Sequence, residues 1–210
     1  MTPVGVMIVD DQSISRQLFE MYVNSSDNYR LICSVESAAY ADLFVLRGNI
    51  DLILMDILMN DGSNGLSAAQ EIKRIMPEIK IIAVTSMPEV SWLDRAKEIG
   101  IESFWYKESS RETILEVMDR TMAGESVYPE NAPAVQLGYA KSSDFTKREL
   151  DVLRVMTAGV SNAVIAEKLG ISEHTVKMHV KHLIEKTGCE NRTQLAIRAR
   201  VSGLVISDDV

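Results

Sequence analysis

Short apolar runs alternate with amphipathic segments over residues 1–122, and this alternation restricts the fold more than any other feature of the chain. The apolar runs have the composition of strands, which we predict at Val4–Val9, Arg30–Val35, Leu52–Met55, Ile79–Val84 and Ser103–Tyr106. The segments between and after them have helical spacing, at Ile14–Val23, Ala38–Leu46, Leu66–Ile75, Val90–Ile99 and Thr113–Met122. This alternation predicts an α/β fold with a doubly wound, five-stranded parallel sheet.

Local signals refine this prediction. Leu52–Met55 and Ile79–Val84 are apolar almost throughout, which indicates strands that are buried on both faces. Ser109 and Glu112 have the spacing of a capping box that opens the last of these helices. Pro88 suits the first turn of the helix before it.

Polar side chains stand at the ends of four predicted strands. Asp10 and Asp11 follow the first strand, Asp56 follows the third, and Thr85 and Lys107 follow the fourth and fifth. Ligands of an open parallel sheet gather at the carboxyl ends of its strands. Carboxylates bind a divalent cation that offsets their repulsion, while a hydroxyl and an ammonium meet phosphate oxygens. We therefore predict a site that phosphorylates its own Asp56.

Each of these residues has a simpler explanation when it is taken alone. The acidic pair Asp10-Asp11 is typical of a solvated turn, and Asp56 suits the cap of a following helix. Lys107 suits an exposed surface, and Thr85 suits a strand because it is β-branched. The functional interpretation depends on their order and on their common position at strand ends.

From about Ala123 to Ser143 the alternation stops, and residues typical of turns predict a linker. They are Gly124, Pro129, Asn131, Pro133, Gly138, Ser142 and Ser143. We therefore expect one domain over 1–122, a linker over 123–143 and a second, all-helical domain over 144–210. Thr146 with Glu149 predicts a capping box at the start of the second domain, and Phe145 with Leu150 predicts a hydrophobic staple.

Charge is distributed unevenly along the chain, whose net charge is −8. Residues 1–140 carry 11 basic and 21 acidic side chains, whereas residues 141–210 carry 11 and 9. Residues 174–200 contain six basic and two acidic side chains. A locally basic region in an acidic protein favours binding to a polyanion.

Residues 162–181 fit a helix-turn-helix. Ala166 is small enough for two helices to approach closely, and Gly170 suits a left-handed turn. Val176 would then pack the second helix onto the first. In that second helix, Val176, Val180, Leu183 and Ile184 form the inward stripe. The residues directed outward are His174, Lys177, Met178 and Lys181.

The polar residues at the strand ends resemble those of the receiver domain of bacterial response regulators, over residues 4–122. The resemblance implies that Asp56 accepts the phosphoryl group. It also implies that Asp11, Asp56 and the backbone carbonyl of Leu58 hold Mg²⁺, with Asp10 acting largely through water.

In the same resemblance Thr85 is the switch hydroxyl and Lys107 the lysine that meets the phosphoryl group. Phe104 fits the aromatic switch position, although a strand aromatic packed on a helix is the alternative. Two departures lie beside the site. Asn60 stands where the family usually has proline, and the loop Asp61–Gly65 is one residue longer than is typical.

Residues 144–204 resemble the LuxR-type four-helix domain. The motifs that carry the resemblance are Phe145-Thr146-Lys147-Arg148-Glu149, Val152-Leu153, Ile165-Ala166, Thr175-Val176-Lys177, His179-Val180 and Asn191-Arg192-Thr193. The two domains in this order resemble the NarL/FixJ family. This implies a DNA-binding transcription regulator, not an enzyme, whose partners are a histidine kinase and double-stranded promoter DNA.

The LuxR-type resemblance also assigns roles in DNA binding. Lys177, Met178 and Lys181 face base edges, and Thr175 and Arg192 are candidates for phosphates. The last helix, roughly Arg192–Val201, pairs with its copy in the family, so we expect a homodimer on DNA.

Two other functional classes share some of these sequence features. A phosphatase of the dehalogenase type also uses Asp, Thr and Lys at strand ends, but it needs a carboxylate where this chain has Leu58. A constitutive DNA-binding regulator would use the receiver only as a dimerisation module.

The chain shows no pattern of a signal peptide or a membrane span. Cys33 and Cys189 match no zinc or redox spacing, which favours free thiols in a reducing cytosol. We therefore expect a soluble cytoplasmic protein.

Overall fold

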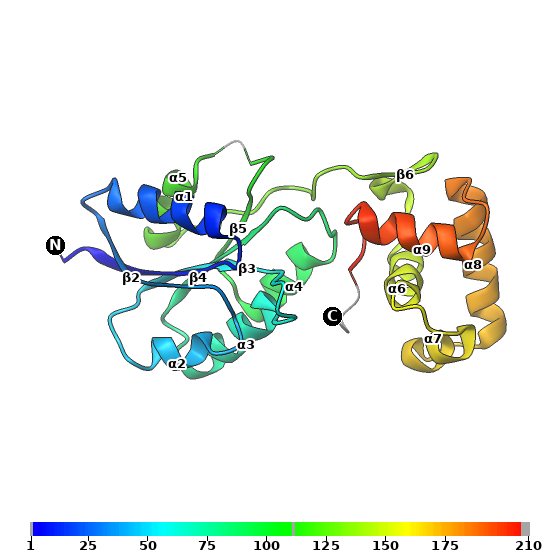
Figure 1. Cartoon of the computed structure of the whole chain (residues 1–210), viewed down its shortest axis with the longest axis horizontal. Helices are drawn as coiled ribbons and strands as arrows, with labels where there is room; N and C mark the ends of the chain where they lie inside the picture. Colours follow the sequence, from blue (N-terminus) through cyan, green and yellow to red (C-terminus); the bar gives the residue numbers. More distant parts are fainter. Residues whose placement is uncertain (1, 111, 207–210) are drawn as a thin grey trace. The chain divides into compact units, whose positions relative to one another are not determined.

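The computed structural model describes residues 2–110 and 112–206, and it divides into two compact units (Figure 1). The first unit runs to Ser86 and resumes over Ser91–Asn131, and the second comprises Met87–Val90 and the chain from Ala132 onward. The domain limits expected at residues 122 and 143 stay predictions. In the described parts of the chain, no helix is both long and apolar enough to cross a membrane.

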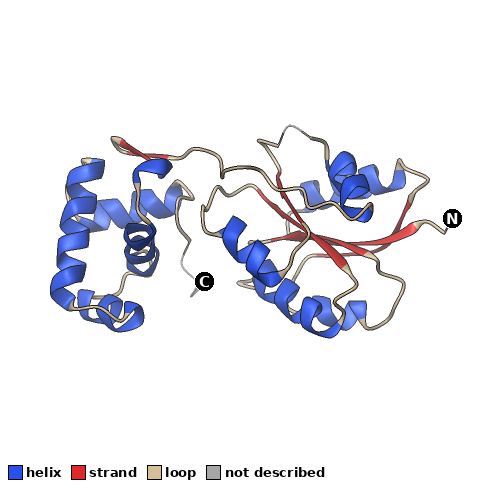
Figure 2. Ribbon diagram, turned by 180° about the vertical axis from the view of Figure 1, so that it is seen from behind, coloured by secondary structure: helices blue, strands red, loops and turns tan. Residues whose placement is uncertain are grey.

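The first unit contains a five-stranded parallel sheet with strand order β2-β1-β3-β4-β5. Its strands are β1 (Val4–Val9), β2 (Tyr29–Val35), β3 (Leu52–Asp56), β4 (Lys80–Thr85) and β5 (Ser103–Tyr106). Its helices are α1 (Ser13–Asn24), α2 (Ala41–Val45), α3 (Gly65–Ile75), α4 (Trp92–Ile99) and α5 (Ile114–Met122). Helices α1 and α5 cover one face of the sheet, and α2, α3 and α4 cover the other (Figures 1 and 2). The doubly wound fold is thereby confirmed.

The apolar runs form strands because both faces of the sheet are covered. Every residue of β3 is buried, as are Ile81–Thr85 in β4, in keeping with their nearly continuous apolar sequence. One core cluster joins side chains of β1, β3 and β4 with α1 and α5, including Ile8, Phe19 and Val117. This core packs α1 and α5 against one face of the sheet.

The starts of three helices differ from the sequence prediction. Helix α2 occupies only Ala41–Val45, and α4 begins at Trp92, so Pro88 lies in the preceding loop. The capping box of α5 is formed by Thr113 and Glu116 and not by Ser109 and Glu112. The same capping pattern therefore occurs twice in sequence, and the second occurrence is the one at which the chain turns helical.

The first unit extends beyond α5 because residues after it pack on β5, the edge strand. The amide of Phe104 donates to the Val127 carbonyl at 2.8 Å, and the Val127 amide donates to Ser103 Oγ at 3.1 Å. The Tyr128 hydroxyl donates to the Ile101 carbonyl at 2.8 Å. These contacts cover backbone groups that an edge strand would otherwise expose.

The second unit is mainly helical. Its helices are α6 (Lys147–Met156), α7 (Asn162–Leu169), α8 (Glu173–Thr187) and α9 (Arg192–Val201). The capping box of Thr146 and Glu149 is present, as predicted. A hairpin of β6 (Gln136–Leu137) and β7 (Ala140–Lys141) lies within the segment predicted to be a linker, and the short 3₁₀ helix Ser142–Asp144 follows it.

The hairpin turn requires glycine at position 138. Gly138 has a φ of +62°, and a Cβ atom there would lie 1.9 Å from the Thr187 carbonyl oxygen. The turn thus packs directly on the end of α8. Two residues per strand are too few for a periodic pattern, so the sequence indicated only a turn.

Candidate functional sites

Three acidic side chains and a lysine meet at the carboxyl edge of the sheet. Asp10 follows β1 and Asp56 ends β3, and both are buried, with 1% and 3% of their surface exposed. Lys107 follows β5, and its Nζ lies 2.8 Å from Asp10 Oδ2 and 2.7 Å from Asp56 Oδ2. The strand ends therefore bring together residues that are up to 97 positions apart in sequence.

Asp10 is held by further hydrogen bonds at the start of α1. The Gln12 amide donates to its Oδ1 at 2.9 Å, and the Ser15 hydroxyl donates to its Oδ2 at 2.7 Å. Both carboxylate oxygens of Asp10 therefore have protein partners. The sequence prediction missed Ser15, because a serine in the first turn of a helix is common without any such role.

Asp11 differs from Asp10 in leaving one oxygen available. Its Oδ2 accepts the backbone amide of Asn60 at 2.7 Å. Its Oδ1 is buried and has no hydrogen-bond partner among the residues that the structure describes. A buried carboxylate oxygen without a partner is costly unless an ion or water completes it.

The acidic cluster suits a divalent cation. One ligand atom from each of Asp10, Asp11 and Asp56 lies within 4.8 Å of the others. Carboxylate oxygens are the ligands that Mg²⁺ prefers, and Mg²⁺ commonly uses one or two of them. The unpartnered Asp11 Oδ1 is an independent reason to expect a cation, so the residues fit the magnesium site implied by the sequence.

Burial dominates the electrostatics of Asp56. Removal from water raises the pKa of Asp56 from 3.8 to about 6, against the opposing attraction of Lys107. Burial would by itself lower the pKa of Lys107, but Asp56 and Asp10 outweigh it and raise that pKa. At neutral pH the pKa values therefore favour an ionised Asp56 beside a protonated Lys107.

The loop from β3 to α3 positions Asp56 through a close backbone approach. A Cβ atom at Gly65 would lie 1.9 Å from the Asp56 carbonyl oxygen, so only glycine fits there. The Asn64 side chain caps α3 by accepting the Leu66 and Ser67 amides at 2.9 and 3.2 Å. Helix α3 thus begins directly against the end of the strand that carries Asp56.

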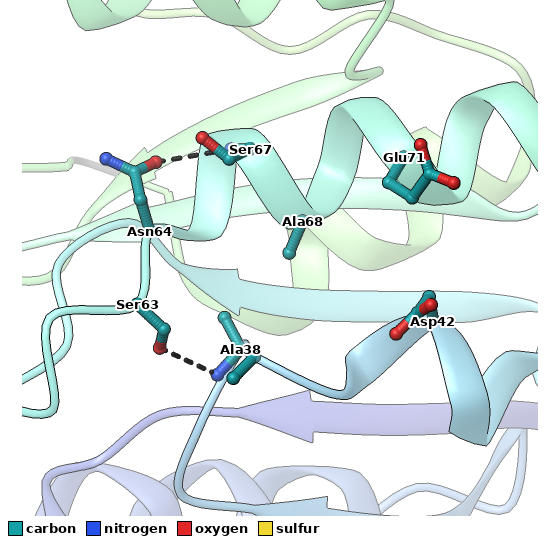
Figure 3. A pocket seen from close by; sticks show the side chains of 8 residues that line it. Ala38, Asp42, Ser63, Asn64, Ser67, Ala68 and Glu71 are labelled. Atoms are coloured by element: carbon teal, nitrogen blue, oxygen red, sulfur yellow. Dashed lines mark hydrogen bonds between the residues drawn. The ribbon is translucent and has the colours of Figure 1, made fainter.

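A cavity of about 250 Å³ lies beside this loop, between α2 and α3 (Figure 3). Small residues, hydroxyls and two carboxylates line it, among them Ala38, Asp42, Ser63, Ser67 and Glu71. None of Asp10, Asp11, Asp56 or Lys107 lines it. The cavity is therefore separate from the acidic cluster.

Thr85 and Phe104 lie on the two strands next to the cluster. Thr85 is buried at the end of β4, one residue after Val84, the register partner of Asp56. The Phe104 ring is buried, with its centroid 5.0 Å from that of Tyr106 and 6.2 Å from that of Tyr128. The switch roles of Thr85 and Phe104 stay predictions.

In the second unit, α7, a turn and α8 form the predicted helix-turn-helix. Gly170 ends α7 with a φ of +63°, and Val176 is fully buried while Ala166 is nearly so. Helix α8 buries Val176, Val180, Leu183 and Thr187. Its exposed face carries His174, Lys177, Met178 and Lys181, the residues predicted to contact DNA.

Two other residues predicted to bind DNA already have protein partners. The Thr175 and Ser172 hydroxyls lie 2.8 Å apart at the start of α8. Arg192 donates to Asn162 Oδ1 and to the Val160 carbonyl, both at 2.8 Å, which ties the start of α9 to the start of α7. Arg192 thus has a clear structural role, and its phosphate contact stays a prediction.

Helix α9 keeps part of its apolar surface exposed. Leu195 and Ala199 are buried in the core of the unit, whereas Ile197 and Val201 are 58% and 80% exposed. Exposed apolar side chains on one helix are compatible with the pairing expected for it. The dimer surface itself stays a prediction.

Each of the two units is similar to a known protein family. Residues 6–119 match the family described as response regulator receiver domain, and residues 143–199 match bacterial regulatory proteins of the luxR family. Over 207 residues the chain is 31% identical to response regulator protein VraR of Staphylococcus epidermidis and of Staphylococcus aureus, covering 96% of this chain and 99% of theirs.

Solved structures show the same fold. A structure of two RcsB dimers bound to two parallel DNAs has a TM-score of 0.62 at 20% identity, covering 94% of this chain and 98% of that one. Response regulator ChrA of a heme-sensing two-component system has a TM-score of 0.52 at 22% identity, covering 96% and 98%.

Proposed function

The chain belongs to the NarL/FixJ family of two-component response regulators, and we propose on this basis that phosphorylation of Asp56 by a histidine kinase controls its binding to promoter DNA. The observation that carries the proposal is the group of Asp10, Asp11, Asp56 and Lys107, in which Asp10 and Asp56 are buried, in a chain that also contains a LuxR-type DNA-binding domain.

Asp56 acts as the nucleophile. One of its carboxylate oxygens forms a bond to the phosphorus of the donor, while the bond to the donor's leaving group breaks and the leaving group keeps the electron pair. Because Asp56 is ionised above about pH 6, the step needs no general base. A bound Mg²⁺ would supply positive charge that offsets the charge of the incoming phosphoryl group.

Lys107 has two roles in this proposal. Before phosphorylation its ammonium, 2.7 Å from Asp56 Oδ2, lowers the repulsion between Asp10 and Asp56. After phosphorylation the ammonium is close enough to meet a phosphoryl oxygen with a small movement. Asp10 and Asp11 hold the cation side of the cluster.

The switch begins with Thr85 and Phe104. Phosphorylation replaces one negative charge by about two and adds acceptor oxygens, which attract the Thr85 hydroxyl. Phe104 contacts Tyr128, whose neighbour Val127 is hydrogen-bonded to β5. Movement of Phe104 therefore changes the packing of the segment that leads to the second unit.

The exposed face of α8 reads the DNA. Lys177 and Lys181 reach base edges, Met178 contacts a thymine methyl group and His174 lies beside them. Thr175 and Arg192 contact phosphates. The chain binds as a homodimer through α9, with half-sites centred about 10 bp apart.

DNA-binding measurements on the full chain test the proposal. The DNA is a fragment that the chain itself selects from random sequence, and binding is followed by fluorescence anisotropy at one fixed salt concentration. Treatment with phosphoramidate and Mg²⁺ should tighten binding by wild type about tenfold, a coupling of about 1.4 kcal/mol. Asp56→Asn should show no change.

Two variants test the DNA surface. Lys177→Ala should weaken specific binding with and without phosphoryl donor, because it removes a contact to the DNA. Lys168→Ala, a lysine near the end of α7, should have a smaller effect. Equal binding by treated and untreated wild type would instead support a constitutive regulator whose receiver serves only for dimerisation.

A further inference from the structure

The backbone amide of Asn60 is part of the acidic cluster although its side chain is not. The N–H donates to Asp11 Oδ2 at 2.7 Å, across 49 positions of sequence. A proline at position 60 would have no N–H to donate. This contact therefore exists because position 60 carries a residue other than proline.

Because of this contact, the two carboxylate oxygens of Asp11 differ in their hydrogen bonding. Oδ2 is held by the Asn60 amide, while Oδ1 is buried without a partner among the described residues. The torsion that turns a carboxylate about its last bond is otherwise broad. A hydrogen bond to one oxygen fixes this torsion and leaves the other oxygen as the ligand. The donor is neutral, so the negative charge of Asp11 is not cancelled.

The amide is itself held in place, because the loop that contains it is anchored at several points. The Ser63 hydroxyl accepts the Ala38 amide at 3.1 Å, which joins the loop to the segment before α2 (Figure 3). Asp61 accepts hydrogen bonds from the Ser37 and Ser63 hydroxyls. Leu58 and Asn64 close the base of the loop through a backbone bridge.

We propose that the Asn60 amide is a positioning group for Asp11 and raises the affinity of the acidic cluster for a divalent cation. The proposal deepens the proposed function, on which it rests, by assigning a role to the loop that differs from the usual family pattern. Outer groups that orient metal ligands commonly change metal affinity by about 10-fold or more when they are removed.

The test compares Asn60→Pro with Asn60→Ala in the full chain. Proline removes the N–H, whereas alanine keeps it and removes only the side chain. Mg²⁺ binding is measured by isothermal titration calorimetry and by the fluorescence of Trp92 and Trp105. The dissociation constant should rise about 10-fold in Asn60→Pro and stay within about twofold of wild type in Asn60→Ala. Equal affinities in the two variants would overturn the proposal.

A second pair of variants covers the case in which Asn60→Pro does not fold. Ser37→Ala removes a hydrogen bond that anchors the loop, and Ser67→Ala removes a hydroxyl that lines the cavity beside it. Ser37→Ala should weaken Mg²⁺ binding about threefold, near 0.6 kcal/mol, and Ser67→Ala should not. Unchanged affinity in Ser37→Ala, with Asn60→Pro unfolded, would also overturn the proposal.

Measuring phosphoryl-adduct formation on each variant distinguishes a failure of this inference from a failure of the proposed function. Asn60→Pro should still form the adduct when Mg²⁺ is saturating, because only cation binding is weakened. Absence of any adduct on wild type would reject the proposed function, whereas the Mg²⁺ affinities alone decide the role of Asn60.

Discussion

Two buried carboxylates, one in each unit, pair with a lysine at the same distance but differ in their electrostatics. Asp56 lies 2.7 Å from Lys107 in the first unit, and Glu149 lies 2.7 Å from Lys186 in the second. Burial raises the pKa of Asp56 to about 6. Burial acts in the same direction on Glu149, but hydrogen bonds from Lys186 and Thr146 outweigh it and hold the pKa below its usual range.

The difference lies in how completely each carboxylate is compensated. Glu149 receives the Thr146 amide and hydroxyl at 2.8 and 3.1 Å in addition to Lys186. Asp56 shares Lys107 with Asp10, and it accepts the Leu58 amide at the longer distance of 3.4 Å. A fully compensated buried carboxylate holds structure together. An incompletely compensated one gains from a cation or a phosphoryl group, which is what a switch requires.

The largest expected effect comes from removing the compensated carboxylate. Glu149→Ala should destabilise the second unit by about 3 kcal/mol, because it removes a helix cap and leaves Lys186 without its partner. Calorimetry of the full chain measures this, while Trp92 and Trp105 fluorescence follows the first unit separately. Glu173→Ala, which removes an exposed glutamate of α8, is the control and should cost less than about 0.5 kcal/mol. Equal effects of the two variants would contradict the comparison.

Asp56→Asn should have the opposite effect and should stabilise the first unit. Asp56 binds its proton more tightly in the folded chain, with a pKa of about 6, than in the unfolded chain, near 3.8. Its ionised form therefore destabilises the first unit increasingly as pH rises from about 4 through about 6. At pH 8 without divalent cation, the asparagine variant should be more stable by about 2 kcal/mol.

Urea unfolding followed by tryptophan fluorescence measures the effect of Asp56→Asn. The gain should shrink towards zero when the same comparison is made at pH 4. A variant less stable than wild type at pH 8 would mean that Lys107 compensates Asp56 fully.

Mg²⁺ should stabilise only the first unit. At a concentration about ten times the dissociation constant, binding adds about 1.4 kcal/mol to the stability of the unit that contains the site. Asp11→Asn should remove most of this gain, and the second unit should not respond. Calorimetry with Mg²⁺ and with EDTA compares the two units, and equal stabilisation of both would contradict the assignment of the site.

The smallest effect tests the charge of Glu149 alone. Glu149→Gln keeps the size of the side chain, and we expect a loss of about 1 kcal/mol at pH 7. Because the pKa of Glu149 is lowered by folding, its stabilising effect is present above the ordinary carboxyl pKa and is lost as pH falls through the lowered value. The difference between wild type and Glu149→Gln should therefore disappear at strongly acidic pH, in contrast to Asp56→Asn. Stability measured from pH 7 to pH 2 checks this.

The sequence predicted well those features that depend on local patterns. The apolar runs identified all five strands of the sheet because both faces are buried, and the strand ends then brought Asp10, Asp11, Asp56 and Lys107 together. The cap formed by Thr146 and Glu149 was also visible, because its spacing is fixed by one turn of helix.

Features that depend on the backbone or on distant segments were not predictable in the same way. The backbone amide of Asn60 donates a hydrogen bond to Asp11. Sequence patterns describe side chains, so they do not indicate which backbone N–H will make such a contact. Val127 and Tyr128 pack on β5, although their sequence indicates only a linker. The LuxR-type resemblance predicts a phosphate contact for Arg192, but nothing in the sequence indicated that its guanidinium also joins the start of α9 to the start of α7.

Intact-mass analysis of the full chain after treatment with phosphoramidate and Mg²⁺ is the most direct test of phosphorylation at Asp56. We expect one phosphoryl adduct on wild type, located on Asp56 by peptide mapping, and none on Asp56→Asn or in the presence of EDTA. No adduct on wild type, or the same adduct on Asp56→Asn, would contradict the claim that the incompletely compensated cluster accepts the phosphoryl group.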